Sequence, residues 1–346
     1  MLVRIDEAMT GPGGQVVTRG QLVRDFRRLG VMAGQTLLVH ASLRSFGWVR
    51  GGADTVVGAL RQALGPRGNI VVPASTETNS LTSRKHRERI AQMTAKQANR
   101  YYDEMPAFDR DTTKSGAGAI AETVRKSSGA FRSDHPQSSF AAIGPAAEYL
   151  MADHRLESHL GEHSPLAKLY RMDARVLMIG VGYRSCTAFH LAEYRYRPEL
   201  AEQTYSCVVN IAGRRQWKYY RDVVLDDREF EDIGKALDIE LAIEAGRVGD
   251  ADCRLISLSN AVDFAVKWMA EYRDGKNSPA PTFSSFLLNY PAVGAGRERS
   301  RSPVGSSALR SHPLSYPRPG GYLPLRQSRP WLILVKGIYV RCLWGA

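Results

Sequence analysis

The sequence predicts an α/β fold, in which helices and strands alternate along most of the chain. Residues 35–43 form a short apolar run of the kind that a buried strand needs, and residues 69–75 form a second one. Between them, residues 53–65 carry valine and leucine at helical spacing and end on a glycine. This strand–helix–strand order predicts a βαβ unit, the building block of α/β proteins. The contents of apolar (43 %) and charged (24 %) residues are typical of a globular chain that buries a core.

The remaining elements continue this alternation. A helix is expected after Thr18, whose hydroxyl suits an N-cap, and it should end near Gly30. Further helices are predicted at 118–126, 146–154, 230–246 and 257–273. Further strands are predicted at 138–144, 174–182, 207–213 and 218–225, the last two with the alternation of antiparallel strands. Residues 80–107 are polar and charged, which predicts a surface helix and a loop, either as a lid or as another substrate-facing element.

Positive charge is concentrated near the C-terminal end of the sequence. The chain has a net charge of +12, and residues 277–346 hold eight arginines and one lysine against one glutamate. These 70 residues therefore carry +8, and the other 276 carry only +4. They also hold nine of the 17 prolines, which interrupt any helical or strand pattern. We predict a folded domain at 1–276 and a Pro/Ser/Arg-rich extension at 277–346 that is disordered or non-native; an arm that binds nucleic acid is the alternative.

The cysteines and the apolar segments exclude several classes of protein. The four cysteines are far apart in the sequence, which argues against a disulfide scaffold or a zinc ribbon and favours reduced thiols. No apolar segment is long enough for a membrane span, and residues 1–15 lack the apolar core of a secretory signal. His154, His159 and His163 are spaced poorly for zinc, so no metal is predicted. We expect a cytoplasmic protein without a membrane partner.

A histidine and a carboxylate share one face of a predicted helix. His190 and Glu193 stand at positions i and i+3, directly after the predicted strand 174–182 and a turn. A carboxylate beside an imidazole fixes its tautomer and raises its basicity, as a general base requires. Ligand sites of α/β proteins also lie at the ends of such strands. The spacing therefore predicts a general base, and an ordinary surface ion pair is the alternative.

A glycine-bearing loop follows the first predicted strand. Gly47, Gly51 and Gly52 stand between that strand and the helix at 53–65. Backbone N–H groups at the start of a helix attract anions, so this loop suits a phosphate group. It lacks the dinucleotide pattern GxGxxG, and a turn between strand and helix often needs glycine in any case.

Four motifs in order give the chain a resemblance to a known family. They are VHASLRSFGWVRGG with the segment that follows to residue 75, FRSDHPQSSFAAIG (131–144), GEHSPLAKLY (161–170) and VLMIGVGYRSCTAFHLAEYR (176–195). Together they resemble the aminoglycoside N(3)-acetyltransferase family over about residues 15–275. The resemblance implies a mixed-sheet α/β/α architecture, unlike that of the GNAT acetyltransferases. It also implies transfer of acetyl from acetyl-coenzyme A to the 3-amino group of aminoglycoside antibiotics, and hence resistance.

The resemblance further implies roles for individual residues. His190 would be the general base, Glu193 would orient it, and Thr187 would contact the thioester. The residues implied to bind coenzyme A are Ser42, Leu43, Phe46, Gly47, Val49, Gly51, Gly52 and Gly118. His135 and Ser164 would shape the substrate site, with loop packing as the alternative for both.

Charge and one departure from the family pattern complete these expectations. A polycationic substrate needs a negative pocket, for which Glu104 and Asp109 are candidates. Lys114 stands where the family often has proline, and Ala117 precedes Gly118, which puts the cofactor contacts of this loop in doubt. Two other hypotheses stay open: a family member that acetylates another amine, and a nucleic-acid-binding protein that uses the basic extension. A homodimer is also expected.

Overall fold

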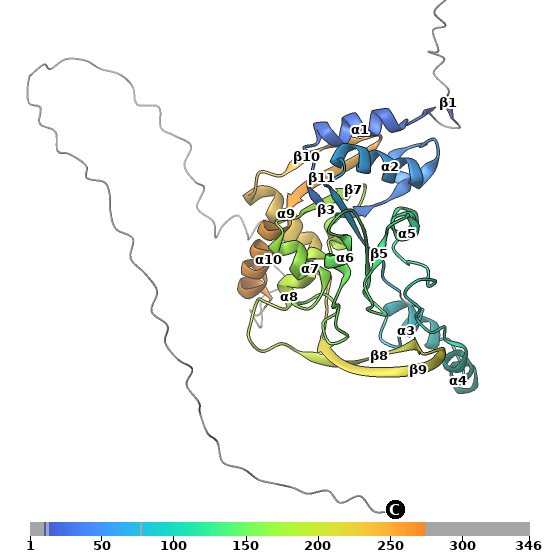
Figure 1. Ribbon diagram of the computed structural model, residues 1–346. Coiled ribbons are helices and arrows are strands. Elements are labelled where there is room, and N and C mark those ends of the chain that lie inside the picture. Colours follow the sequence, from blue (N-terminus) through green and yellow to red (C-terminus); the bar gives the residue numbers. More distant parts are fainter. Residues whose placement is uncertain (1–9, 12–13, 77, 274–346) are drawn as a thin grey trace, which may run out of the picture. The chain divides into compact units, whose positions relative to one another are not determined.

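The computed structural model describes residues 10–11, 14–76 and 78–273. The boundary predicted after residue 276 and the extension 277–346 lie outside the described residues. A seven-stranded mixed sheet forms the centre, in the order β10-β11-β7-β3-β4-β6-β5 (Figure 1). Its strands are β3 (Thr36–Ala41), β4 (Asn69–Pro73), β5 (Phe131–Arg132), β6 (Phe140–Ile143), β7 (Arg175–Ile179), β10 (Glu244–Val248) and β11 (Ala251–Ser257). The predicted βαβ unit is confirmed, because β3 is parallel to both β4 and β7.

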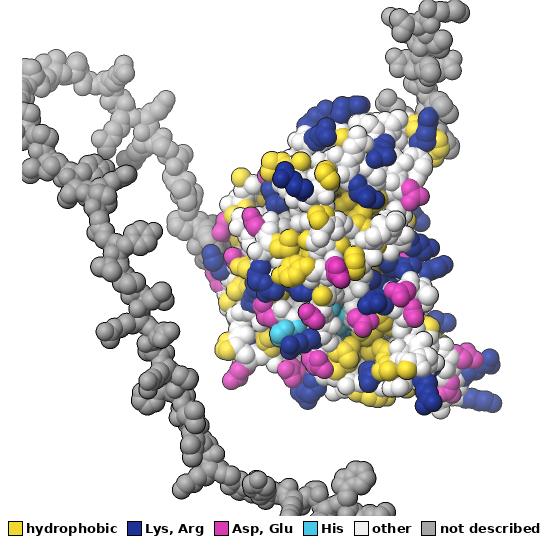
Figure 2. Space-filling view, in the orientation of Figure 1, with side chains coloured by type: hydrophobic (Ala, Val, Ile, Leu, Met, Phe, Trp, Pro, Cys, Tyr) yellow, Lys and Arg dark blue, Asp and Glu magenta, His cyan; other side chains and the backbone are white. Residues whose placement is uncertain are grey.

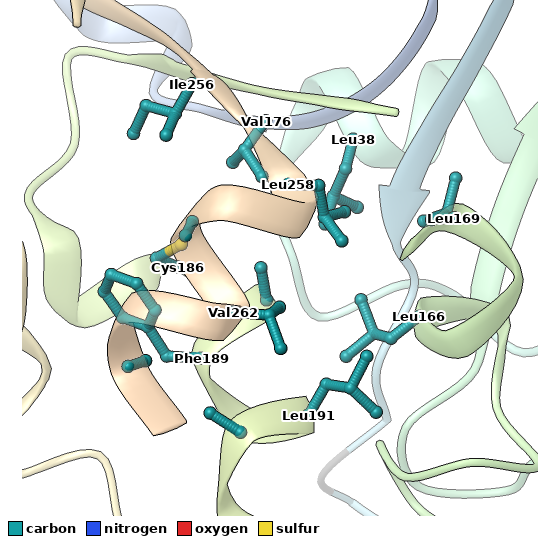
Figure 3. Packing of buried hydrophobic residues seen from close by; sticks show 14 of the residues in the cluster. Leu38, Leu166, Leu169, Val176, Cys186, Phe189, Leu191, Ile256, Leu258 and Val262 are labelled. Carbon is teal, nitrogen blue, oxygen red and sulfur yellow. The ribbon is translucent and has the colours of Figure 1, made fainter. Parts of the chain in front are cut away.

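Helices cover both faces of this sheet and give it three layers. One face packs against α1 (Arg19–Arg28), α2 (Gly52–Leu64) and α5 (Ala119–Lys126). The other packs against α6 (Ala147–Met151), α7 (Pro165–Arg171), α8 (Ala188–Glu193), α9 (Phe230–Glu240) and α10 (Leu258–Tyr272). Neighbouring residues of β3 face opposite layers, since Leu38 lies in one core and Leu37 and Val39 in the other. Figure 3 shows Leu38 and Val176 of the sheet among side chains of α7, α8 and α10. The predicted α/β/α architecture is confirmed.

Most of the predicted elements are present, and one is wrong in part. The hydroxyl of Thr18 accepts a hydrogen bond from the backbone N–H of Gln21, as expected of an N-cap. The helix predicted at 230–246 instead ends at Glu240, and Glu244–Val248 is strand β10. The reason is tertiary, because β10 forms a complete antiparallel ladder with β11, which in turn pairs with β7. Helical spacing alone cannot anticipate that ladder.

A long hairpin lies outside the central sheet. Strands β8 (Glu202–Ile211) and β9 (Arg214–Val223) pair along their whole length, as the alternation of residues predicted. Ala212 and Gly213 form its two-residue turn with φ angles of 49° and 76°, the left-handed values that such tight turns require. The polar segment 80–107 contains two short helices, α3 (Arg84–Ile90) and α4 (Ala95–Glu104). Bridges from Ser80 and Phe108 attach the two ends of this segment to β8.

Short elements and the surface complete the description. Strand β1 (Thr10–Gly11) pairs with β2 (Gly14–Gln15), and the short helices η1 (Leu43–Phe46) and η2 (Tyr183–Ser185) follow β3 and β7. Figure 2 shows Lys and Arg side chains gathered over α1, and acidic and basic side chains interspersed farther down the same face. Across the described ranges, none of the helices has the length and apolar character that crossing a membrane requires.

Candidate active site

The two predicted catalytic side chains lie on α8, in the layer of helices that also contains α10. Helix α8 begins just after β7 and η2, and its buried residues Phe189, Leu191 and Ala192 anchor it in the core. His190 and Glu193 share the remaining face of this helix. The Nδ1 atom of His190 lies 2.6 Å from Oε2 of Glu193. The spacing of three residues on a single helix brings the pair together without any help from distant parts of the chain.

Glu193 is itself held from its other side. It is 1 % exposed, and its Oε1 accepts hydrogen bonds from Nη1 of Arg273 at 2.6 Å and from the backbone N–H of Asp226 at 2.9 Å. Arg273 also donates to Glu229 at 2.5 Å. Because these two donors engage Oε1, the other oxygen, Oε2, is left to accept a hydrogen bond from Nδ1 of His190. Such a pair fixes the imidazole as the Nδ1–H tautomer and leaves the lone pair on Nε2.

The other side of the His190 ring is partly exposed to solvent. The side chain of His190 is 16 % exposed to solvent. The rings of Phe230 and His190 pack edge to face with a centroid distance of 4.7 Å. Within the part of the chain that the structure describes, no group forms a hydrogen bond with Nε2. A neutral imidazole with a carboxylate on one nitrogen and a free lone pair on the other has the arrangement of a general base.

A cavity of about 430 Å³ lies at the carboxyl ends of the parallel strands. It is lined by the ends of β3 and β4, by Gly116 and Ala117 before α5, and by Arg184, Ser185 and Thr187 before α8. This is the edge of the sheet where α/β proteins bind ligands. Thr187 was predicted to belong to the site, and it stands in the cavity wall three residues before His190.

His40 is a cavity residue that was not singled out from the sequence. It lies near the carboxyl end of β3, it is 7 % exposed, and its Nε2 is 3.0 Å from Oγ1 of Thr187. Burial and the nearby His190 lower its pKa to about 4, so the ring is neutral near pH 7. A histidine inside an apolar strand was the only available signal, because its partner is 147 residues away.

The predicted cofactor loop follows β3 but does not line this cavity. Gly51 is the N-cap of α2, and Gly47, Gly51 and Gly52 have φ angles of 81°, 80° and 58°. A Cβ atom at Gly47 would also collide with the carboxylate of Asp250. Phe46 and Val49 have buried side chains that pack in the core, which gives them a structural role.

The other predicted cofactor residues lie at the ends of the same strand and of a neighbouring helix. Ser42 and Leu43 directly follow Ala41 and are only partly buried, so both stay within reach of a ligand at this edge. Gly118 is the N-cap of α5 with a φ angle of 97°, next to the cavity residue Ala117.

In the described residues, none of the predicted substrate residues forms a hydrogen bond or an ion pair with His190. Ser164 caps α7 by accepting from the N–H of Leu166, and Asp109 accepts from the N–H groups of Asp111 and Thr112 in its own turn. Its hydrogen bonds with Thr112 hold the pKa of Asp109 below its usual value. Glu104 is exposed at the end of α4, where it pairs with Arg100 at 2.7 Å. All three carry local contacts that fully account for their positions.

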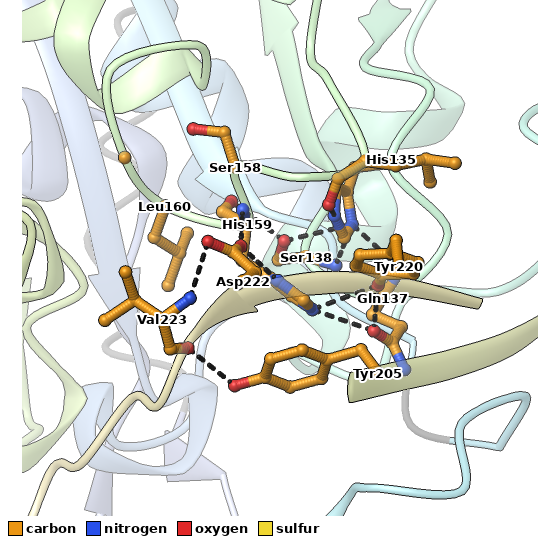
Figure 4. A network of polar contacts seen from close by, with 12 residues as sticks. His135, Gln137, Ser138, Ser158, His159, Leu160, Tyr205, Tyr220, Asp222 and Val223 are labelled. Atoms are coloured by element: carbon orange, nitrogen blue, oxygen red, sulfur yellow. Dashed lines mark hydrogen bonds and ion pairs between the residues drawn. The ribbon is translucent and has the colours of Figure 1, made fainter. Parts of the chain in front are cut away.

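His135 belongs to a separate buried network (Figure 4). Its Nδ1 accepts from the N–H groups of Gln137 and Ser138, and its Nε2 faces the carbonyl of Leu156. The ring of His159 lies 4.5 Å away, and Nδ1 of His159 is 2.6 Å from Oδ2 of Asp222 on β9. The network therefore joins the hairpin to the body of the protein.

Neither cysteine nucleophiles nor a metal cluster are evident at the cavity. Burial raises the pKa of Cys186 to about 12, so its thiol stays protonated and unreactive. Cys186 packs in the core four residues before His190. Among the residues that the structure describes, no group of three or more His, Cys, Asp or Glu side chains is arranged to hold a metal ion.

Comparisons with known proteins give the chain a consistent set of relatives. Residues 38–270 match the family model of aminoglycoside 3-N-acetyltransferase. The aminoglycoside N(3')-acetyltransferase-like protein YokD of Bacillus subtilis is 36 % identical over 272 residues, which are 75 % of this chain and 94 % of that protein.

Two solved structures of enzymes are also similar. AAC-VIa bound to sisomicin has a TM-score of 0.64 and 33 % identity, and the match covers 74 % of this chain and 98 % of that one. AAC-IIIb in a binary complex with CoASH has a TM-score of 0.66 and 27 % identity, covering 76 % of this chain and all of that one.

Proposed function

The chain belongs to the aminoglycoside 3-N-acetyltransferase family, and we propose that it transfers the acetyl group of acetyl-coenzyme A to the 3-amino group of the deoxystreptamine ring of aminoglycosides. The reaction inactivates the antibiotic and gives resistance. The observation that carries the proposal is the His190–Glu193 pair, with Nδ1 engaged at 2.6 Å, on the helix that directly follows the cavity residue Thr187. The complexes of similar enzymes with sisomicin and with CoASH support the two substrates.

His190 would supply the proton transfer that the reaction needs. An amine is mostly an ammonium ion near pH 7 and lacks the lone pair that attacks a thioester. The ammonium first loses one proton to solvent, which frees its lone pair. Nε2 of His190 then takes a second proton from the attacking nitrogen as the N–C bond forms, and Glu193 stabilises the resulting imidazolium. The C–S bond then breaks, the acetamide is released, and the imidazolium returns its proton to the thiolate of coenzyme A. No acyl-enzyme is required, which agrees with the protonated thiol of Cys186.

The loop between β3 and α2 would hold coenzyme A. Helix α2 is 13 residues long and begins at Gly52, where the space beside the backbone is open to a phosphate. Ser42 and Leu43 directly follow the cavity residue Ala41, and Gly118 directly follows the cavity residue Ala117. We place the pyrophosphate at this helix start and the thioester in the cavity beside Thr187.

The aminoglycoside would enter on the side of α9. The acidic segment 226–232 begins beside Glu193, and its carboxylates pair with arginines: Asp226 with Arg228, and Glu229 with Arg273. An ammonium group of the substrate replaces the exposed Arg228 at Asp226 at low cost, because exposed pairs contribute little. We further propose that residues 1–276 make up the catalytic domain. We also propose that the protein acts in the cytoplasm, which supplies acetyl-coenzyme A and keeps thiols such as the buried free cysteines reduced.

Release of free thiol from acetyl-coenzyme A tests this function directly. The purified full-length chain is assayed with a panel of aminoglycosides, and with His190→Ala as the control. We expect thiol release that depends on the antibiotic, together with a product acetylated at the 3-amino group by NMR. Thiol release with other amines but with no aminoglycoside would replace the proposed acceptor. If acetyl-coenzyme A binds but no amine causes thiol release, the proposed reaction is contradicted.

A further inference from the structure

Thr187 is a helix N-cap whose hydroxyl does not cap its helix. Threonine at this position usually accepts a hydrogen bond from a backbone N–H two or three residues later. Here Thr187 has helical backbone angles and makes no such bond. Its hydroxyl instead points at His40, with Oγ1 3.0 Å from Nε2. The side chain that would ordinarily stabilise α8 is therefore directed toward the cavity.

His40 is equally unusual for a residue of a central strand. It is nearly fully buried in β3, yet in the described ranges its ring has Thr187 as its hydrogen-bond partner and no other. Both residues line the cavity, and Thr187 stands three residues before His190 in the chain. A buried polar group is normally retained only where it is satisfied or used. Here the strand places a histidine against a hydroxyl in the cavity wall.

We propose that His40 is a positioning residue for acetyl transfer: its Nε2–H donates to Oγ1 of Thr187 and leaves the hydroxyl proton of Thr187 to donate to the thioester oxygen. This inference rests on the proposed function. As the amine nitrogen attacks, the carbonyl oxygen gains negative charge, and a fixed donor there stabilises the transition state. When the C–S bond breaks, the carbonyl re-forms. The proton of Thr187 stays on its oxygen throughout, so neither Thr187 nor His40 changes its protonation state.

The electrostatics of the pair favour this direction of the hydrogen bond over the opposite one. In the opposite case His40 would accept the hydroxyl proton and activate Thr187 as a nucleophile. Burial lowers the pKa of His40 to about 4, with a further contribution from His190, so its ring is a weak base near pH 7. When His190 takes a proton from the amine, its positive charge makes protonation of His40 still less favourable. A neutral histidine that only donates is compatible with both facts.

Four variants separate positioning from a general loss of structure. His40→Leu and Thr187→Val remove the hydrogen bond while keeping much of the volume. His40→Gln keeps an N–H donor, and Thr187→Ser keeps the hydroxyl. His163→Gln, an exposed histidine with no side-chain role described above, is the control. For each variant, kcat and the KM for acetyl-coenzyme A are measured, together with the unfolding temperature and the binding of CoASH.

The expected result is a loss in kcat that conservative variants restore. His40→Leu and Thr187→Val should each lower kcat by about 100-fold, as loss of an oxyanion donor does, with little change in KM. The double variant should lose little more than either single one, because both remove the same interaction. His40→Gln and Thr187→Ser should keep most of the activity, and the pH profile of His40→Gln should match that of the wild type.

Several outcomes would overturn the proposal. They are an unchanged kcat in folded His40→Leu, a His40→Gln variant as slow as His40→Leu, and an acetyl adduct on Thr187 in a quenched reaction without acceptor. The slow hydrolysis of acetyl-coenzyme A in the absence of amine passes through the same oxyanion, so it is measured for the same variants. If aminoglycosides are not accepted, the proposed function fails, but the effect of His40 on hydrolysis still decides this inference.

Discussion

The protein contains two histidine–carboxylate pairs of equal length in different surroundings. Nδ1 of His190 lies 2.6 Å from Glu193, and Nδ1 of His159 lies 2.6 Å from Asp222. The contrast is in the second ring nitrogen. Nε2 of His159 is 2.8 Å from Oε1 of Gln137 and 3.1 Å from the hydroxyl of Tyr220, whereas Nε2 of His190 has no such partner in the described ranges.

This comparison shows that the pair itself does not make a catalytic residue. Asp222 also accepts from the hydroxyl of Tyr194 at 2.9 Å, directly after α8, so the His159 network links the hairpin to the end of α8. Every group in it is used to hold two elements together. At His190 only one side of the ring has a hydrogen-bond partner among the described residues, and the proposed function assigns the other side to a substrate. The following predictions test this division, from the largest expected effect to the smallest.

His190→Ala should remove the base and leave the fold intact. We expect kcat to fall by about 1,000-fold, within the range of 100- to 10,000-fold for general bases. Acetyl-coenzyme A should still bind, as judged by calorimetry. His159→Gln is the matched variant, and it should lower the unfolding temperature while the folded enzyme keeps its kcat. If instead His159→Gln lost activity at unchanged stability, the two pairs would not be divided as described.

Asp222→Asn should show the opposite pattern, with a large loss of stability. It removes the charge that holds His159 while keeping the volume, and breaking a buried pair costs about 3–5 kcal/mol. The free energy of unfolding from urea titration measures this loss. Asp226→Asn, on the partly exposed pair with Arg228, is the control and should cost far less. Equal losses in both variants would contradict a special role for the buried network.

Glu193→Gln should lower kcat by about 100-fold, less than removal of His190. Arg273 and the N–H of Asp226 require an acceptor at one side of residue 193, so the new amide N–H₂ would face His190. It would then favour the tautomer with the proton on Nε2, which cannot act as a base. Glu229→Gln also touches Arg273 but not His190, and it serves as the control. Comparable losses in both would show that Arg273, and not the tautomer, matters.

The buried histidine network should make the free energy of unfolding decrease as the pH falls below 6.5. Burial lowers the pKa of His154 from 6.5 to about 4 and that of His135 well below 6.5. Below pH 6.5 the unfolded chain therefore binds protons that the folded chain excludes, so stability falls as the pH drops from 6.5 toward 4. Each such histidine contributes at most about 1.4 kcal/mol per pH unit. Urea titrations at several pH values should give this slope, and His154→Gln should reduce it by one proton.

Truncation after Lys276 should change neither pair. Every contact named above for His190 and for His159 comes from residues up to Arg273. We expect kcat and the unfolding temperature of the truncated chain to match those of the full chain. A salt-sensitive binding of DNA that disappears on truncation would instead give the basic extension the function of the nucleic-acid alternative.

The sequence by itself determined the features that depend on local spacing. Alternating apolar runs and helical stretches predicted the βαβ unit, most of the helices and the β8–β9 hairpin, because period and turn chemistry are properties of neighbouring residues. The same holds for His190 and Glu193, which meet across a single turn of helix. The four motifs added the family, which the family model also identifies.

Tertiary structure alone decided the contacts between residues that are far apart in sequence. Residues 244–248 became a strand because β11 offered a ladder, not because of their own pattern. His159 finds Asp222 across 63 residues, and His40 finds Thr187 across 147. No periodicity encodes such pairs, since they depend on which strands become neighbours in the sheet. Which histidine is buried in a network and which one faces a cavity follows only from that arrangement.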